Sequence, residues 1–285
     1  MRFRHPGWGP VARLFDWLAN QRALARLRRA VFARLPFLRQ ESDVHDVVYL
    51  NWVVLLERVR PLVPDGVRIA ERGGHAILTV LTYAHKHFGP AFLGQWRGIC
   101  PSPLQSNWRL YVETIDGVAP AQPTVLFLAN VFDSTAYAVG TRCFSDALPS
   151  HVAERFRHDV ERDRIVTRIE GGAGSAPSLS SVVARSDERG LPAAYQAWFD
   201  TWEQAIAALS LQDAAIAAVP GLQRNAIAGI DLPIDLAQVQ PLRVVEFAPG
   251  EWLQSLGATS APFAFGVPWV HFRVLWERVL QPGGT

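Results

Sequence analysis

The sequence predicts an α+β fold that is mainly antiparallel β-sheet, closed into a barrel, with helices flanking the sheet. Many short segments are rich in β-branched and aromatic residues, which favours strands. Turn signals separate these segments at short spacing, and few helical stretches intervene. Strands joined by short turns pair antiparallel, whereas βαβ units need a helix between successive strands, so a repeated βαβ sheet is not expected.

The first 40 residues are predicted to form a basic helical extension. Within residues 10–35, apolar side chains such as Val11 and Leu14 recur at helical spacing. The extension contains nine arginines and a single acid, Asp16, which gives it a net charge of +8. One hypothesis is that the arginines contact an anionic membrane surface or a protein partner. The favoured alternative is that the helix packs on the body and exposes its arginines to water.

The rest of the chain, residues 41–285, is predicted to be one barrel domain. Asp133-Ser134 can cap a first helix, and Pro192 suits the first turn of a second. The helices are expected at 135–144 and 192–210. Alternating or β-branched patterns predict strands at 46–55, 76–85, 106–114, 124–132, 164–170, 178–185, 242–248 and 269–279.

Composition narrows the functional classes. The total charge is +2 and the extension carries +8, so the barrel domain carries −6, and no nucleic-acid partner is expected. Cys100 and Cys143 form no CxxC pair, which favours reduced thiols and a cytoplasmic location. No stretch of about 18 apolar residues predicts a membrane span. No cofactor is expected, because P-loop and dinucleotide-binding signatures are missing. The oligomeric state is left open.

The stretch "LTYAHKHFGP" contains the only lysine of the chain, Lys86, between two histidines. Alternation along a strand would place His85 and His87 on one face and Lys86 on the other. Two histidines can supply two metal ligands, but a third must come from elsewhere. A polar strand end is the favoured interpretation, so no metal site is predicted. A lysine beside a turn is also poorly placed for the desolvation that an imine-forming amine needs.

The stretch "SNWRLYVE" is the second candidate for chemistry. Alternation places Asn107, Arg109, Tyr111 and Glu113 on the face opposite Trp108. On an exposed sheet this row is a solvated surface with an ion pair. Inside a barrel it becomes an anion or carbonyl site, with Arg109 as the carboxylate clamp and Glu113 as the proton carrier. The residues alone favour the surface interpretation slightly.

Three stretches together resemble a known family: "YLNWVVLLERVRPLVPDGVRI", "LTVLTYAHKHFGP" and "SPLQSNWRLYVE". They are similar to the uncharacterised YqjF-type family, a domain of unknown function grouped with acetoacetate decarboxylase-like proteins. The similarity is clearest over residues 44–155 and does not cover the first 40 residues. It implies a barrel-like antiparallel sheet with a central cavity, and it implies that Asn107, Arg109 and Glu113 face this cavity.

The resemblance also bears on the lysine. Acetoacetate decarboxylases form an imine on one member of a Lys-Lys pair, and the matching stretch here is "GTRCFSDALPSHVAERF". Ser150 and His151 stand where the lysines would be, so decarboxylation through a lysine imine is not expected. His151 could act as a general acid or base in the pocket. The alternative is a surface histidine at a helix end.

Two function hypotheses follow. In the first, the cavity binds a small organic acid or carbonyl compound, with Asn107, Arg109 and Tyr111 as binding residues. In the second, the protein is an enzyme of lyase or hydrolase type that acts on such a compound without a Schiff base. Glu113 and His151 are then the catalytic candidates. The first is favoured, because no strong catalytic signature replaces the missing lysine.

Overall fold

The computed structural model describes residues 1–32, 35–219 and 221–281. The predicted N-terminal helix forms two helices, α1 (Pro10–Asn20) and α2 (Arg22–Phe32), and residues 33 and 34 of that prediction lie outside the described residues. The remaining helices are short. They are α3 (Leu56–Val59), α4 (Thr135–Phe144), α5 (Trp202–Ser210) and α6 (Glu251–Ser255), with 3₁₀ turns η1 (Arg60–Leu62), η2 (Ala91–Ile99), η3 (Ala193–Tyr195) and η4 (Leu236–Gln238).

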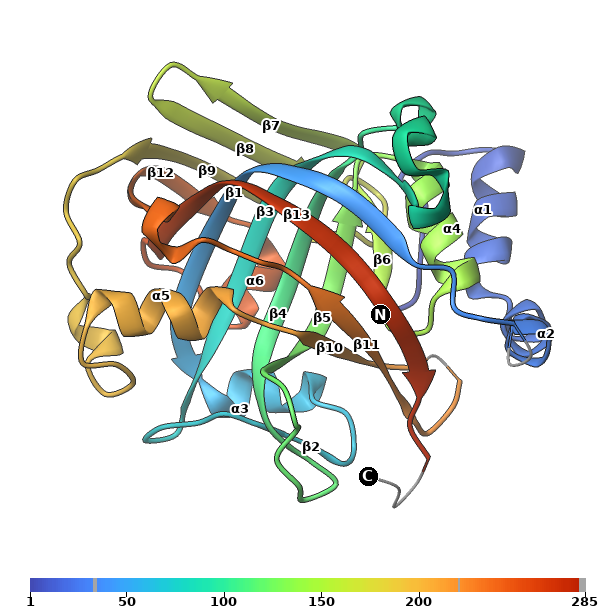
Figure 1. Ribbon diagram of the computed structural model, residues 1–285, viewed down its shortest axis with the longest axis horizontal. Coiled ribbons are helices and arrows are strands. Elements are labelled where there is room, and N and C mark those ends of the chain that lie inside the picture. The colour runs from blue at the N-terminus through green and yellow to red at the C-terminus, as the bar shows by residue number, and fades with distance from the viewer. Residues whose placement is uncertain (33–34, 220, 282–285) are drawn as a thin grey trace.

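The described part of the chain forms one 13-stranded sheet (Figure 1). All eight predicted strands are present, several of them longer than predicted. The strands are β1 (Gln40–Leu55), β2 (Val67–Ile69), β3 (His75–Pro90), β4 (Leu104–Ile115), β5 (Thr124–Phe132), β6 (Ser150–Val152), β7 (Arg155–Glu161), β8 (Arg164–Glu170), β9 (Leu179–Arg185), β10 (Ala214–Ala218), β11 (Asn225–Asp231), β12 (Gln240–Pro249) and β13 (Phe263–Val279).

Seven strands close into a ring, which confirms the predicted barrel-like antiparallel fold. The ring order is β1-β3-β4-β5-β10-β11-β13, and β13 pairs back onto β1 over Gln40↔Val274 to Asn51↔Phe263. Within the ring only β5 and β10 run parallel. A branch of four strands, β12-β9-β8-β7, leaves the ring where β12 pairs with β13. The 17-residue β13 pairs with β1 along one edge, while its other edge pairs with β12 near its start and with β11 near its end.

Alternation along β1 divides the core into two regions. Leu50 and Trp52 pack in a cluster that also includes Leu179 of β9, so this face meets the branch. Val47 and Tyr49 belong to a second cluster, inside the ring, together with Ile206 of α5. The ring therefore has a packed outer layer and a closed interior, and side chains two residues apart enter the same region.

The predicted helix at 192–210 is only partly correct. Residues 193–195 form the 3₁₀ turn η3, and α5 begins at Trp202. Thr201 caps α5, because its hydroxyl accepts a hydrogen bond from the backbone N–H of Gln204 at 3.2 Å. A residue in this capping geometry cannot continue a helix from the preceding residues, so the tryptophan-rich segment is broken in two. Helix α5 then packs against the ring interior.

The N-terminal extension is docked on the body beside α4 (Figure 1). Phe3 is almost fully buried against Phe132 and Val152. Helix α2 is held by an ion pair: Arg29 donates two hydrogen bonds to Asp146, at 2.7 and 2.8 Å, and Arg28 contacts the same carboxylate. The expectation that the arginines of this helix face water is therefore wrong for Arg28 and Arg29.

Asp146→Asn should loosen the extension. Burial would raise the pKa of Asp146, but the Arg29 hydrogen bonds and the Arg28 charge outweigh it and hold that pKa below its ordinary value. Removing the charge leaves two arginines against a neutral amide, and breaking such a buried pair costs about 3 kcal/mol of unfolding free energy. Denaturant unfolding and limited proteolysis between α2 and β1 measure the effect.

Asp159→Asn is the matched control, because Asp159 pairs with Arg157 on the exposed strand β7. Exposed pairs contribute about 0.5 kcal/mol. Equal stability losses in the two variants would contradict the assigned role of Asp146.

Candidate functional site

A cavity of about 70 Å³ lies inside the ring. Strand β4 contributes Gln105, Asn107 and Arg109 to its wall, at alternate positions that share one face. Apart from a few polar groups, the wall is aliphatic and aromatic, with Leu81 and Phe272 among its members. Because a buried water needs about 10–15 Å³ on a comparable measure, the cavity has room for a solute of several heavy atoms.

Arg109 is the central polar group of this wall. Only 2% of its surface is exposed, and one terminal amino group donates a 2.7 Å hydrogen bond to the backbone carbonyl of Leu209. That carbonyl lies in the last turn of α5, where the helix dipole is negative and favours a cation. The guanidinium carbon lies 5.5 Å from the ring centre of Tyr49 and 5.7 Å from that of Tyr111.

The charge of Arg109 is incompletely compensated. Among the described residues it forms no ion pair, and its Nε–H is buried without a hydrogen-bond partner. An unpaired buried donor or charge costs stability, and proteins usually supply a partner. A cavity lined by such a guanidinium is electropositive, and no described residue supplies an acceptor for its Nε–H.

A chain of buried hydrogen bonds orients the neighbouring amides. Gln105 donates to the side-chain oxygen of Asn107 at 2.8 Å, and Asn107 donates to the hydroxyl of Tyr83 at 2.9 Å. The other end of the chain is His85, whose Nε2 lies 2.7 Å from the side-chain oxygen of Gln105 and whose Nδ1 lies 2.8 Å from the Ser42 hydroxyl. The amides are thereby held in fixed positions along the cavity wall.

Three ionisable side chains near Arg109, those of His85, Tyr49 and Tyr83, are kept neutral. Burial lowers the pKa of His85 to about 4, although the hydrogen bond with Gln105 opposes the change. Burial raises the pKa of Tyr49 to about 12, and Arg109 opposes it. The pKa of Tyr83 is raised by burial as well. At neutral pH these three side chains therefore carry no negative charge that could offset the charge of Arg109.

The predicted row does not remain together. Asn107 and Arg109 line the cavity, whereas Tyr111 lies further along β4 and donates its hydroxyl to the carbonyl of Leu209 at 2.9 Å. Glu113 lies at the exposed end of the strand. Its carboxylate is 46% exposed and pairs with Arg68 of β2 at 2.9 Å. The family resemblance implied that Glu113 faces the cavity, and this expectation is wrong.

His151 lies outside the cavity wall, in β6 beside β5. It is fully buried, so the alternative of a surface histidine is wrong. Its Nδ1 lies 2.7 Å from the hydroxyl of Ser175, and its Nε2 lies 3.4 Å from Arg142. Burial, followed by the charge of Arg142, lowers its pKa well below the ordinary value. The N-terminal segment covers this group, because Arg142 also donates to the carbonyl of Met1.

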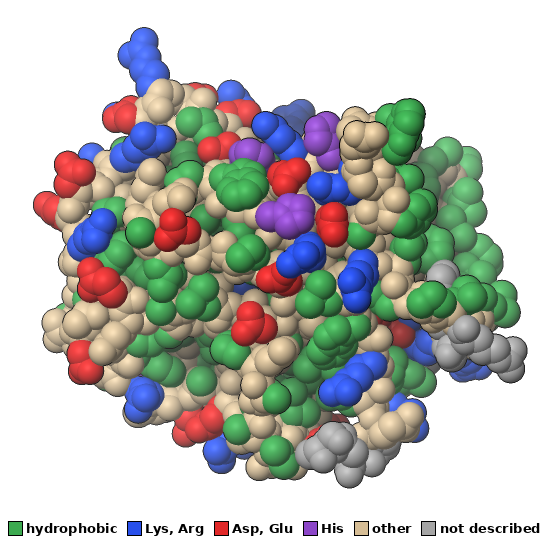
Figure 2. All heavy atoms as spheres, in the orientation of Figure 1, with side chains coloured by type: hydrophobic (Ala, Val, Ile, Leu, Met, Phe, Trp, Pro, Cys, Tyr) green, Lys and Arg blue, Asp and Glu red, His purple; other side chains and the backbone are tan. Residues whose placement is uncertain are grey.

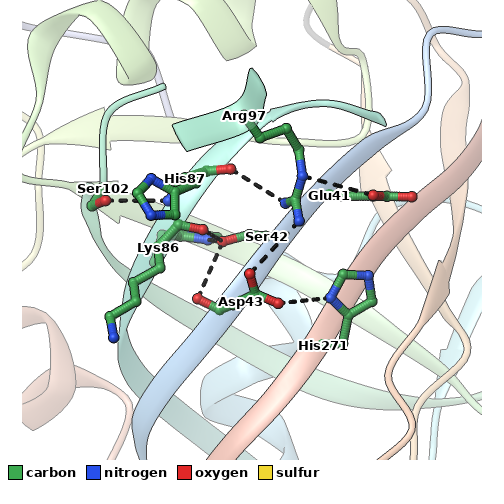
Figure 3. Close-up of polar contacts among 9 residues, drawn as sticks. Glu41, Ser42, Asp43, Lys86, His87, Arg97, Ser102 and His271 are labelled. Carbon is green, nitrogen blue, oxygen red and sulfur yellow. Dashed lines mark hydrogen bonds and ion pairs between the residues drawn. The ribbon is translucent and has the colours of Figure 1, made fainter. Parts of the chain in front are cut away.

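The histidines around Lys86 do not form a pair. His87 has a positive φ of 54°, and the β1–β3 register shifts at this point, so the strand alternation that would align it with His85 is broken. Both ring nitrogens of His85 already have protein partners. Figure 3 shows the exposed Lys86 with its amine pointing away from the polar contacts around Asp43. No group of three potential metal ligands occurs among the described residues.

The structure adds Glu277 of β13 to the cavity wall. Burial raises the pKa of this carboxyl group, although hydrogen bonds from the backbone of Asp146 and the hydroxyl of Ser145 oppose the change. No sequence pattern distinguishes Glu277, because it lies in an amphipathic strand among other charged residues. Its neighbours Ser145 and Ala147 also line the cavity, so the loop after α4 forms part of the wall.

The comparisons with known proteins agree with this architecture. A family model described as DUF2071, an uncharacterized conserved protein (COG2071), matches residues 41–202, which confirms the resemblance found in the sequence. No curated protein matches the chain.

Solved structures show the same fold at low sequence identity. The enduracididine biosynthesis enzyme MppR with HEPES bound is 14% identical, with a TM-score of 0.54 over 87% of this chain and 90% of that one. The acetoacetate decarboxylase of Legionella pneumophila is 8% identical, with a TM-score of 0.54 over 86% and 88%. An acetoacetate decarboxylase-like enzyme from Sphingomonas wittichii is 10% identical, with a TM-score of 0.51 over 85% and 93%.

His85→Gln should make the protein less sensitive to acid. A buried neutral histidine resists protonation in the fold, so its stabilising effect is complete above the ordinary pKa of 6.5 and is lost as pH falls towards about 4. The loss for the parent protein amounts to about 3 kcal/mol over this window. Urea unfolding from pH 7.5 to 4.5 measures the slope.

The variant should start less stable at pH 7.5, because a glutamine cannot reproduce both contacts, but its stability should fall less steeply. The other buried histidines are common to both proteins, so the difference in slope reports on His85. Identical slopes would show that the fold leaves the pKa of His85 unchanged and would contradict this account.

Proposed function

This chain belongs to the DUF2071 family of uncharacterized conserved proteins, and within its acetoacetate decarboxylase-like fold we propose that the ring cavity binds a small organic acid or a related carbonyl compound. The observation that carries the proposal is the incompletely paired guanidinium of Arg109 in the cavity wall. A carboxylate would accept the free Nε–H and neutralise the charge.

The proposal assigns distinct roles to the neighbours of Arg109. Asn107 would orient the ligand, and the hydrogen bonds of its amide with Gln105 and Tyr83 support this role. Tyr111 supports the site indirectly, since it shares the Leu209 carbonyl with Arg109 and positions the end of α5. The apolar wall around Leu81 and Phe272 favours a ligand with a short hydrocarbon part.

A related protein offers a ligand for a first test. MppR has been solved in complex with pyruvate, which is a small carboxylate with an adjacent carbonyl group. Its sequence is 13% identical to this chain, so pyruvate enters as a chemical probe. The proposal includes a cytoplasmic setting, in which Cys100 and Cys143 stay reduced.

Binding without turnover is the favoured form of the proposal. The two proton carriers considered from the sequence, Glu113 and His151, are absent from the cavity wall. Glu277 is present there, but both of its carboxylate oxygens accept hydrogen bonds from the loop after α4. The enzymatic alternative would need a carboxyl group that is free to exchange a proton with the ligand.

Arg109→Met should abolish ligand binding while the fold stays intact. Methionine keeps much of the side-chain length, and removing an uncompensated buried charge costs little stability. A ligand at 100 times its Kd stabilises a protein by about 2.7 kcal/mol, which raises the melting temperature by about 5 °C at this size. Thermal unfolding with a panel of monocarboxylates and 2-oxo acids measures the rise in the parent protein and its loss in the variant.

Arg68→Met is the matched control, because Arg68 is an exposed arginine paired with Glu113 outside the cavity. It should keep the full ligand-induced rise. The proposal fails if no acid in the panel stabilises the parent, or if Arg109→Met keeps the same response.

Borohydride reduction in the presence of 2-oxo acids should leave Lys86 unmodified. The amine of Lys86 is exposed on the outer side of β3, away from the cavity wall, so no bound ligand can reach it. Intact-protein mass spectrometry measures the adduct. A stoichiometric adduct that maps to Lys86 would restore the imine mechanism.

A further inference from the structure

We propose that the N-terminal helices and η2 form a surface that docks on an anionic lipid bilayer. This lipid-docking surface consists of residues 8–38, as far as they are described, and η2. Of the twenty large hydrophobic residues with exposed side chains in the described part of the chain, thirteen lie in these two segments. The most prominent are Trp8, Leu14, Trp17, Leu27, Phe92 and Trp96.

The two segments are neighbours in the fold. The backbone N–H of Ala91, where η2 begins, donates to the carbonyl of Arg39 at 2.9 Å, just after the helical extension ends. Tyr137 of α4 stacks on Phe88 before η2, while α1 and α2 pack against the same α4. Figure 2 shows hydrophobic side chains gathered on the side of the molecule where Figure 1 places α1.

The degree of exposure is unusual for a water-facing helix. Trp8 is 90% exposed, Trp17 54% and Trp96 69%, whereas α1 buries only Ala12 fully. Monomeric proteins rarely leave such a contiguous apolar area in water. Tryptophan is the side chain best suited to the boundary between water and lipid, because its ring is apolar and its N–H remains solvated.

The charges around this surface are positive. Arg13 of α1, Arg26 of α2 and Arg39 are exposed, and none of them forms an ion pair with a described residue. The single acid of the extension, Asp16, accepts a backbone hydrogen bond from His5. An apolar helix face flanked by unpaired arginines complements a bilayer with anionic headgroups.

The same charges argue against a second copy of the chain as the occupant. In a twofold dimer this surface would meet itself, and the arginines of one copy would face those of the other. No described helix is long and apolar enough to cross a membrane. With 11 residues each, α1 and α2 are shorter than the roughly 20 residues that a membrane-spanning helix needs.

One ion pair links the lipid-docking surface to the wall of the cavity. Arg29 of α2 holds Asp146, whose neighbours Ser145 and Ala147 line the cavity wall. Docking would therefore place one part of the cavity wall next to the bilayer. Lipid docking does not depend on the identity of the cavity ligand, so either proposal can fail while the other holds.

Vesicle co-sedimentation of the full chain tests the proposal. With vesicles of phosphatidylcholine containing about one-third phosphatidylglycerol, the protein should pellet at 0.1 M salt, and it should pellet at least tenfold less with phosphatidylcholine alone. Raising the salt to 0.5 M should weaken binding, because the Debye length shortens. Each of Arg13→Gln, Arg26→Gln and Arg39→Gln should weaken it about fivefold.

Trp8→Ser combined with Trp17→Ser should reduce binding to the anionic vesicles at least tenfold. Trp269→Ser is the matched control, because Trp269 is 51% exposed on β13 and lies outside the lipid-docking surface. Circular dichroism melting checks that each variant is folded. The double variant removes only exposed rings, so its fold should persist.

Three results would overturn the proposal. They are the absence of pelleting with anionic vesicles, equal loss of binding in Trp269→Ser, and equal binding to both vesicle types. Light scattering of the free protein supplies a further criterion. A dimer that the double tryptophan variant converts to a monomer would assign the surface to a second copy instead of a bilayer.

Discussion

The pairing of β13 with β1 is the constraint on which the rest of the structure depends. This pairing converts an open sheet into a ring, and the ring gives β4 an interior face. Without closure, Asn107 and Arg109 would lie on an open sheet, where a guanidinium is hydrated and needs no partner. Closure buries that charge, and the dipole at the end of α5 and the rings of Tyr49 and Tyr111 stabilise it only in part. The binding proposal follows from this remaining imbalance.

Much of the ring could be predicted from local patterns. β5, β8 and α4 begin and end at the predicted residues, because each has a continuous apolar or capped signal. The strands that were missed lack such signals. β10 reads AAIAA, and alanine has low strand propensity, so neighbouring strands determine its conformation. The segment before α5 has helical spacing, but the cap at Thr201 separates it from the helix. Pairing between distant strands is a property that local patterns do not encode.

The type of candidate site could be predicted from the sequence, but only some of its residues could. Strand alternation and the family resemblance together direct Asn107 and Arg109 to one face, and both line the cavity. The same alternation fails for Glu113, because β4 extends beyond the cavity and its end is exposed. Glu277 and the loop after α4 reach the wall through contacts between residues more than 100 positions apart. The interaction of α2 with Asp146 is equally non-local, so the sequence alone gave no sign that the extension supports the cavity wall.

The central claim is that Arg109 provides an anion site inside a closed ring. A crystal structure of the protein soaked with pyruvate tests this claim most directly. We expect density for the ligand inside the ring, with one carboxylate oxygen about 3 Å from the Nε of Arg109 and the other within reach of Asn107. Two results would contradict it. One is ligand density only at the surface of the protein. The other is a cavity that contains only water beside Arg109, both at saturating pyruvate and with every other acid that stabilises the protein.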